Sequence, residues 1–177
     1  LNIANFLNPK FRFNTSLIIE NNFGNENYKK TKVLLNRFNK KDEIYYWYKI
    51  KKITQIISQE SNQEEAINYI NSKFSKIENP STKILFDMGN IAKGFKKYKS
   101  SINYYDSVIS RIEKNSITYA DLLYRRGGSY ERLGKYEESD KDLLKSLEIN
   151  QDDAYVLNYL AYSWLERDYK IKEAIEM

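Results

Sequence analysis

The 177-residue chain contains no cysteine and no histidine. These absences exclude disulfide bridges, a cysteine nucleophile, a histidine base and the zinc sites that the two residue types build. We expect neither a metal ion nor a cofactor. The absence of cysteine does not indicate a compartment, because a chain without disulfides tolerates either redox state.

Proline and glycine are also scarce, with 2 and 6 residues, whereas 30% of the chain is charged. Few helix-breaking residues and many charges favour a mostly helical protein over a sandwich or a barrel. No apolar run approaches the roughly 20 residues that a membrane span needs, and no signal peptide is visible. The chain begins at Leu1 rather than Met, so we expect the native N-terminus to be missing. The sequence is compatible with the cytoplasm or with a bacterial periplasm.

The net charge of +5 conceals a gradient along the chain. Residues 1–58 carry 11 Lys and Arg against 4 Asp and Glu, residues 59–118 carry 9 against 7, and residues 119–177 carry 9 against 13. A basic end could meet an acidic partner or a nucleic acid. We favour a solvated helical face as the interpretation, because such charge mostly keeps proteins soluble. The basic pairs Lys96-Lys97 and Arg125-Arg126 are interpreted in the same way, as helix-surface charge.

The most regular pattern lies in residues 120–153. Leu123, Gly127 and Tyr130 fall at i, i+4 and i+7, which is one face of a helix. Gly134 follows where that helix should end, a position at which positive φ favours glycine. A second helical face comes next: Tyr136, Ser139, Leu143 and Ser146. Small residues on both faces let two helices approach closely, so we predict an antiparallel helical hairpin.

The same frame recurs upstream and downstream. Its copies have these residues on their first faces: Leu85, Gly89 and Ala92 upstream, and Leu157, Ala161 and Trp164 downstream. The upstream copy has a second face as well: Ser101, Tyr105 and Val108. In the downstream copy we expect a one-residue insertion at residues 168–170. Two weaker copies come earlier, with these first faces: Thr15, Ile19 and Asn22, then Ile50, Thr54 and Ile57.

We therefore predict a single repeat array over residues 1–177 that is cut at both ends. It comprises the tail of a preceding repeat, whole repeats and a final partial repeat, with these bounds: 1–11, 12–46, 47–81, 82–119, 120–153 and 154–177. Repeat arrays normally end in a polar cap, so a cut end should expose apolar surface. For that reason we expect the chain to self-associate.

These residues resemble the tetratricopeptide repeat, or TPR. The family frame is an aromatic residue, a Leu-Gly pair, a Tyr, then Ala-x3-Phe and a final Pro. Gly127-x2-Tyr130 and the segment Leu133-Gly134-Lys135-Tyr136-Glu137-Glu138-Ser139 match that frame, whereas Gln151 stands where the family has Pro. The segment Asn158-Tyr159-Leu160-Ala161-Tyr162-Ser163-Trp164 looks like one found in bacterial TPR proteins. The resemblance spans residues 1–177 and is most specific in residues 82–177.

The resemblance implies an all-α fold, a right-handed superhelical solenoid of antiparallel helix pairs. The first helix of each pair would line a concave groove, and that groove would bind a peptide or a helical segment of another protein without catalysis. Residues one turn around from the core face should point into it: Lys51, Gln55, Phe86, Asn90, Lys93, Tyr124, Asn158 and Tyr162. Their mixture of aromatic rings, amides and lysines suits an extended peptide.

A carboxylate clamp is one specific use of such a groove. TPR proteins that bind chaperones hold a C-terminal carboxylate with Lys and Asn side chains, and Lys51 and Asn90 fit that use. However, Gln55 stands where a clamp would have Asn, and Asp121 brings a negative charge near the site. We therefore do not expect a carboxylate clamp.

RNA binding is the main alternative function. Pentatricopeptide repeats resemble TPRs, have about 35 residues and read one base per repeat. The spacings from Arg12 to Trp47 and from Trp47 to Thr82 are both 35 residues. The Gly-x2-Tyr frame and the acidic C-terminal repeats argue against this alternative, so a protein or peptide is the expected partner and nucleic acid is not.

Enzymatic activity is not expected. Adjacent acidic pairs such as Glu137-Glu138 and Asp152-Asp153 do not face each other on a helix, and acids at helix starts favour the helix dipole. Gly127-Gly128 should lie inside a helix and lacks the spacing of a phosphate-binding loop. The sequence shows no nucleophile paired with a base.

Overall fold

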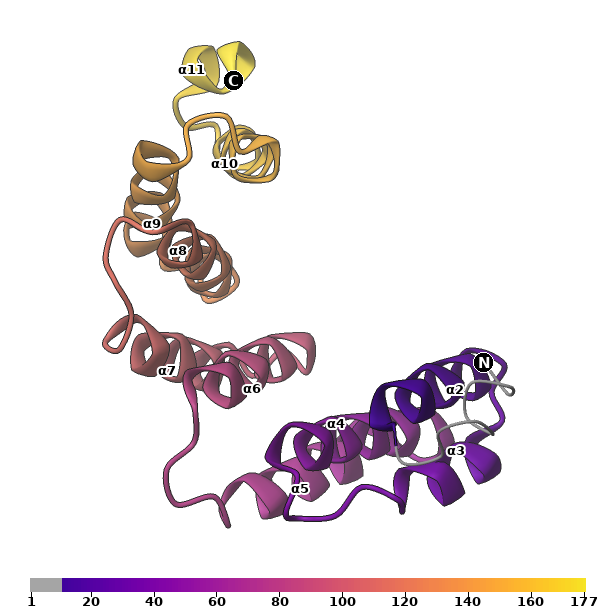
Figure 1. Ribbon diagram of the computed structural model, residues 1–177. Coiled ribbons are helices and arrows are strands. Elements are labelled where there is room, and N and C mark those ends of the chain that lie inside the picture. Colours follow the sequence, from indigo (N-terminus) through magenta and orange to yellow (C-terminus); the bar gives the residue numbers. More distant parts are fainter. Residues whose placement is uncertain (1–10) are drawn as a thin grey trace. The chain divides into compact units, whose positions relative to one another are not determined.

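The computed structural model describes residues 11–177, and every regular element in that range is an α-helix (Figure 1). The prediction of an all-α fold is confirmed. The predicted tail of a preceding repeat lies, apart from Phe11, outside the described residues. The helices are α2 (Arg12–Gly24), α3 (Tyr28–Leu35), α4 (Glu43–Glu60), α5 (Gln63–Phe74), α6 (Thr82–Gly94), α7 (Tyr98–Ile109), α8 (Ile117–Glu131), α9 (Tyr136–Ile149), α10 (Ala154–Glu166) and α11 (Ile171–Glu176).

These helices form two compact units that divide after Glu78. The N-terminal unit contains α2 to α5, and the C-terminal unit contains α6 to α11. Within each unit, helices that follow one another along the chain pack as antiparallel hairpins, for example α6 with α7 and α8 with α9 (Figure 1). The prediction of a single array with the repeat bounds given above stays a prediction.

Aromatic and branched side chains fill the N-terminal unit. Ile19 and Leu35 are fully buried, and Phe38 packs its ring against Tyr45 and Tyr48, with centroids 5.0 and 6.0 Å apart. These rings belong to the core that α2, α3 and α4 share.

Small residues bring the helices of the C-terminal unit closer together. A methyl group added at Gly89 of α6 would lie 2.5 Å from the ring of Tyr105 on α7, and one added at Gly127 of α8 would lie 3.1 Å from Leu143 on α9. The hydroxyls of Ser101 and Ser129 also meet, 3.2 Å apart, across the boundary between α7 and α8. Close approach of the helices in this unit is therefore confirmed, and it depends on residues that lack bulk.

One turn geometry recurs between the helices of four hairpins. Glu26, Lys96, Gly134 and Asp168 all have positive φ. The first three lie two residues before the next helix starts, whereas Asp168 lies three residues before Ile171. The left-handed conformation predicted for Gly134 and the one-residue insertion predicted at residues 168–170 agree with this geometry.

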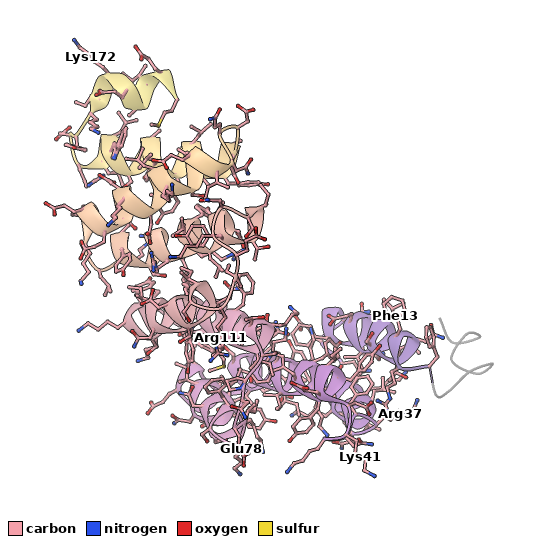
Figure 2. The ribbon with its side chains drawn as sticks, turned by 60° about the vertical axis from the view of Figure 1, so that its left-hand side comes forward. Phe13, Arg37, Lys41, Glu78, Arg111 and Lys172 are labelled. Carbon is pink, nitrogen blue, oxygen red and sulfur yellow. The ribbon has the colours of Figure 1, made fainter. Side chains whose placement is uncertain are left out.

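Side chains cap the first helices of the C-terminal hairpins. The hydroxyls of Ser81 and Ser116 accept hydrogen bonds from backbone amides at the starts of α6 and α8, and the Asp153 carboxylate does so for α10. Such caps satisfy amides that have no partner within the helix, which fixes where each helix begins. At the other end of α7, Arg111 donates to the carbonyl of Pro80 at 2.9 Å and ties the end of the helix to the segment that leads into α6 (Figure 2).

Burial follows the predicted repeat frame in most hairpins, including the weak early copies. Thr15, Ile19 and Asn22 are all buried on α2, as predicted. The frame is less accurate on α10, where Val156 and Leu160 are buried instead of Leu157 and Ala161. The reason is packing, since α10 presents Val156, Leu160 and Trp164 to Leu143 of α9 and Ala174 of α11. No helix among residues 11–177 is long and apolar enough to cross a bilayer.

Candidate partner-binding surface on the C-terminal unit

Arg125 of α8 is the centre of a polar network on the C-terminal unit. Its Nε lies 3.0 and 2.9 Å from the two carboxylate oxygens of Asp121, one helical turn earlier. One terminal nitrogen donates to Oδ1 of Asn90 on α6 at 3.2 Å, and the guanidinium carbon lies 5.1 Å from the centre of the Phe86 ring. The cation therefore links two residues that the sequence predicted for the groove, Phe86 and Asn90.

Asn90 is fixed from a second side. The buried Tyr105 of α7 donates its hydroxyl to the same Oδ1 at 2.8 Å. Because this oxygen accepts from both Tyr105 and Arg125, the orientation of the amide is determined by the protein itself. A side chain held in this way loses little further freedom when a partner binds.

Lys93 lies one turn after Asn90 and completes the network. Its Nζ donates to the backbone carbonyl of Arg125 at 3.2 Å and lies 5.9 Å from the centre of the Tyr124 ring. Burial, followed by the nearby positive charges of Arg125 and Arg132, lowers the pKa of Lys93 to about 8. Gly128 leaves room for this ammonium, since an added methyl group there would lie 2.7 Å from Nζ.

A pocket of about 360 Å³ opens beside the network, between α8 and the start of α10. We call it the tyrosine–aspartate pocket, and its lining residues are Asp121, Tyr124, Arg125, Asp153 and Tyr155. Tyr124 is half-buried, with its ring packed edge-on against Tyr159 at 5.8 Å. Tyr155 is 77% exposed. Burial raises the pKa of Tyr124, so this hydroxyl is neutral at physiological pH.

A second pocket, of about 510 Å³, lies between α6, the end of α7 and the start of α8. We call it the apolar pocket, and its lining residues are Thr82, Lys83, Phe86, Val108, Ile112, Ile117, Thr118 and Asp121. Asp121 lines both pockets. Two hollows of different chemistry therefore adjoin one carboxylate.

The structure brings four of the eight predicted groove residues into this surface and leaves four elsewhere. Phe86, Asn90, Lys93 and Tyr124 all contact Arg125 or its immediate neighbours. The other four are Lys51 and Gln55 on α4 of the N-terminal unit, and Asn158 and Tyr162 on α10. None of these four lines either pocket. Gln55, Asn158 and Tyr162 are exposed, and Lys51 is partly buried.

The interpretation of Arg125-Arg126 as helix-surface charge is wrong. Arg125 builds the network described above. The side chain of Arg126 is only 19% exposed and pairs with Asp142 of α9 at 2.7 Å and with Asp106 of α7 at 2.6 Å. It thus ties three helices together inside the unit.

Sequence reasoning also missed Asp153 and Tyr155 as pocket residues. Asp121 and Arg125 were visible as an i, i+4 pair of opposite charge, which is a signal for contact on a helix. Asp153 reads in the sequence as a helix cap, and its place in a pocket depends on the angle at which α10 follows α9. No group of three or more acidic residues within 11–177 is placed to hold a metal ion.

Comparisons with known proteins agree with this architecture. Residues 120–153 match the family model described as tetratricopeptide repeat. Three similar solved structures are of MamA, a TPR-repeat protein. A MamA RS-1 double mutant has 14% identity, a TM-score of 0.65, and an alignment over 92% of this chain and 87% of that chain. MamA from residue 41 to its end, from Desulfovibrio magneticus RS-1, has 13% identity and a TM-score of 0.65 over 90% and 87%.

A further crystal structure of MamA has 14% identity and a TM-score of 0.62, over 90% of this chain and 89% of that chain. At such identities the likeness shows the fold, and it does not transfer the partners or binding residues of MamA. A search among curated proteins finds no match to this chain. The family match identifies one tetratricopeptide repeat at residues 120–153, and the structural likeness shows that the described residues have an all-helical, TPR-like fold.

Proposed function

We propose that this TPR-type protein, an interaction scaffold by fold, holds a segment of another protein on the surface around Arg125. The observation that carries the proposal is the network in which Arg125 contacts Asp121, Asn90 and Phe86 from two neighbouring first helices. The network fixes polar and aromatic groups beside two open pockets. Pockets of this kind take up side chains of a bound segment.

Preorganisation supports this assignment physically. Binding costs free energy when side chains must be immobilised, and Asn90, Lys93 and Arg125 are already held by bonds within the protein. Aromatic and arginine side chains dominate the binding energy of protein interfaces, and both kinds line this surface. Lys51, Gln55, Asn158 and Tyr162 remain proposed partner contacts outside this surface.

The proposed activity is binding without catalysis. The network consists of a guanidinium, an amide, an ammonium and a carboxylate that already satisfy one another, and no hydroxyl or amine in it is paired with a free base. A carboxylate clamp is also unsupported. Lys93 donates to a carbonyl of the protein, and Asp121 and Asp153 would repel the carboxylate of a partner.

A selection from a displayed peptide library against the immobilised protein tests the proposal. We expect enriched peptides to bind the protein with micromolar dissociation constants and to lose at least about tenfold in affinity on Tyr124→Ala. Lys99→Ala, an exposed change on α7, serves as the control and should change the affinity less than twofold. Circular dichroism checks that both variants fold. Failure to enrich any peptide, or equal affinity for both variants, would contradict the proposal.

RNA binding is less well supported by the described residues. A basic surface with free aromatic rings would suit single-stranded RNA. In the N-terminal unit, which has the basic sequence, Phe38 and Trp47 are buried, and Tyr45 and Tyr48 pack on Phe38. These four rings are not free to stack on bases, and the exposed rings of this unit include Phe11 and Phe13, which pair with each other at 6.2 Å. A salt-dependent gel shift with single-stranded RNA would reverse this preference.

Self-association stays a prediction. Exposed apolar side chains gather at α11, where Ile171 and Ile175 are 45% and 73% exposed. Light scattering across a concentration series should show a rise in mean mass. A monomer at the highest concentration would contradict it.

A further inference from the structure

The charge of the tyrosine–aspartate pocket is opposite to that of the whole chain. The chain carries a net +5, but two carboxylates, Asp121 and Asp153, line this pocket against one cation, Arg125. Nε of Arg125 donates to both carboxylate oxygens of Asp121, so these two charges largely cancel. The pocket is left with about one uncompensated negative charge, on Asp153.

The Asp153 carboxylate is held in place by its role as a helix cap. Its Oδ1 accepts from the backbone amides of Tyr155 and Val156, at 3.1 and 3.3 Å, and its Oδ2 accepts from Asn150 Nδ2 at 3.0 Å. Each carboxylate oxygen can accept more than one hydrogen bond. Asp153 can therefore cap α10 and still receive a donor that enters the pocket.

Two aromatic rings line the tyrosine–aspartate pocket together with these carboxylates. Tyr124 packs against Tyr159, while Tyr155 lines the pocket and is largely exposed. The faces of tyrosine rings attract cations, and the attraction is stronger where water is excluded. Burial is the main cause of the raised pKa of Tyr124; among the charged neighbours Arg125 lowers this pKa, whereas Asp153 and Asp121 raise it, so both acids lie close enough to act on the ring. Carboxylates and ring faces around a hollow of about 360 Å³ form an environment that suits a cationic side chain.

The apolar pocket shares Asp121 with the tyrosine–aspartate pocket. Phe86, Val108, Ile112 and Ile117 supply most of its surface, and its volume of about 510 Å³ accommodates a side chain as large as leucine or phenylalanine. Lys83 is the cation on its rim, and its ammonium lies 3.6 Å from Asp87. Because Asp121 lines both hollows, two side chains of one short segment can enter them together.

We infer that the segment bound on this surface carries a lysine or arginine that enters the tyrosine–aspartate pocket, and beside it an apolar side chain that enters the apolar pocket. This inference rests on the proposed function and narrows its partner to a basic, partly apolar segment of another protein. An acidic segment does not fit, because its carboxylates would face Asp121 and Asp153.

Binding by defined peptides tests this inference. In the library selection above, we expect enriched peptides to share a Lys or Arg within a few residues of a large apolar residue. Fluorescence anisotropy should then show about a tenfold loss of affinity when that basic residue is replaced by norleucine. Replacement by Glu should cost about a hundredfold, because repulsion adds to the lost attraction.

Matched variants locate the effect in the pocket. Asp153→Asn removes the negative charge and keeps a residue that caps helices equally well, so α10 should remain folded. It should weaken the basic peptide about tenfold at low salt, whereas Asp152→Asn, the same change at an exposed neighbour outside the pocket, should change affinity less than twofold. Tyr155→Ala should weaken binding several-fold, and Tyr155→Phe should restore it, because the ring face is retained.

The outcomes separate the two proposals. Enriched peptides without a basic residue, whose binding depends on Tyr124 but not on Asp153, would overturn the inference and leave the proposed function standing. Equal effects of Asp153→Asn and Asp152→Asn would overturn the inference as well, since the charge would then act at long range. If no peptide is enriched, both proposals fall.

Discussion

The helices of the two units pack against one another through different kinds of residue. In the N-terminal unit, large rings such as Phe38 and Tyr45 fill the space between helices. In the C-terminal unit, Gly89 and Gly127 let the helices approach until a ring or a leucine touches the backbone opposite. Packing in the N-terminal unit accommodates many aromatic residues, whereas packing in the C-terminal unit requires a small residue at defined positions.

The difference also decides where polar networks form. Arg126 reaches carboxylates on two other helices of the C-terminal unit, and Arg125 reaches Asn90 on α6. In the N-terminal unit, Lys52 pairs with Glu20 on α2 and stacks on the ring of Phe23, at 2.8 and 4.1 Å. In the C-terminal unit Arg126 thus connects three helices, and two pockets flank the contacts of Arg125.

The largest effect should come from breaking the buried ion pair of the C-terminal unit. Arg126→Met leaves the Asp142 carboxylate, whose side chain is 7% exposed, without a partner. Removing one member of such a pair costs about 3 kcal/mol, because the remaining charge stays buried. Urea unfolding followed by circular dichroism measures the loss.

The matched change in the N-terminal unit is Lys32→Met. Its ion pair with Glu60 joins side chains that are 47% and 40% exposed. Such pairs contribute at most about 1 kcal/mol. Equal losses for the two variants would contradict the expectation that burial sets how much each of these two ion pairs contributes to stability.

Overpacking the contact between α6 and α7 should have the next largest effect. Gly89→Ala places a methyl group 2.5 Å from the ring of Tyr105, which is fully buried and has no space to move. We expect a loss of about 2 kcal/mol in the free energy of unfolding. Gly94→Ala is the control on the same helix, because nothing lies within 4 Å of the added methyl group. It should be neutral or stabilising, and a similar loss there would contradict the packing account.

The buried ammonium of Lys93 should make stability depend on pH. Its pKa is about 8 in the folded protein against 10.5 for an ordinary lysine, so the unfolded chain binds more protons between these values. Stability should therefore rise with pH across that window, by about 1–2 kcal/mol after allowance for partial exposure. Lys93→Met removes the titrating group. Between roughly pH 7.5 and 9.5 the unfolding free energy of the wild type should increase relative to that of the variant. A difference that stays constant with pH would contradict the burial of Lys93.

The smallest effect concerns a turn that both units share. Glu26 and Lys96 hold positive φ without being glycine, at 57° and 58°. Glu26→Gly and Lys96→Gly should each stabilise the protein by up to about 1 kcal/mol, because a left-handed conformation strains a residue with a Cβ. Gly134→Ala should destabilise by a similar amount. Thermal unfolding distinguishes these signs, and opposite signs in the two units would show that the turns are not equivalent.

The sequence predicted the all-α fold and most buried faces, because helical periodicity reports which side of a helix meets its neighbours. It predicted burial on α2 as well as on α8, although only residues 120–153 match the family model. The sequence prediction was wrong on α10, where the buried face depends on the angles at which α9 and α11 pack against this helix. Those angles are a tertiary property with no periodic signal.

The binding surface was only partly predictable. Phe86, Asn90, Lys93 and Tyr124 follow from counting one turn around a known core face. The role of Arg125 does not, because it depends on the distance between α6 and α8. The place of Asp153 in the pocket likewise depends on the path of the chain from α9 to α10. Both features join residues far apart in the sequence: Arg125 donates to Asn90, 35 positions earlier, and shares a pocket with Asp153, 28 positions later.

Hydrogen exchange of the protein with and without a bound basic peptide tests the central claim most directly. We predict that the peptide slows exchange at the start of α6, along α8 around Arg125 and at the start of α10, and leaves α2 to α5 unchanged. Protection confined to the N-terminal unit, or absent around Arg125, would contradict the account.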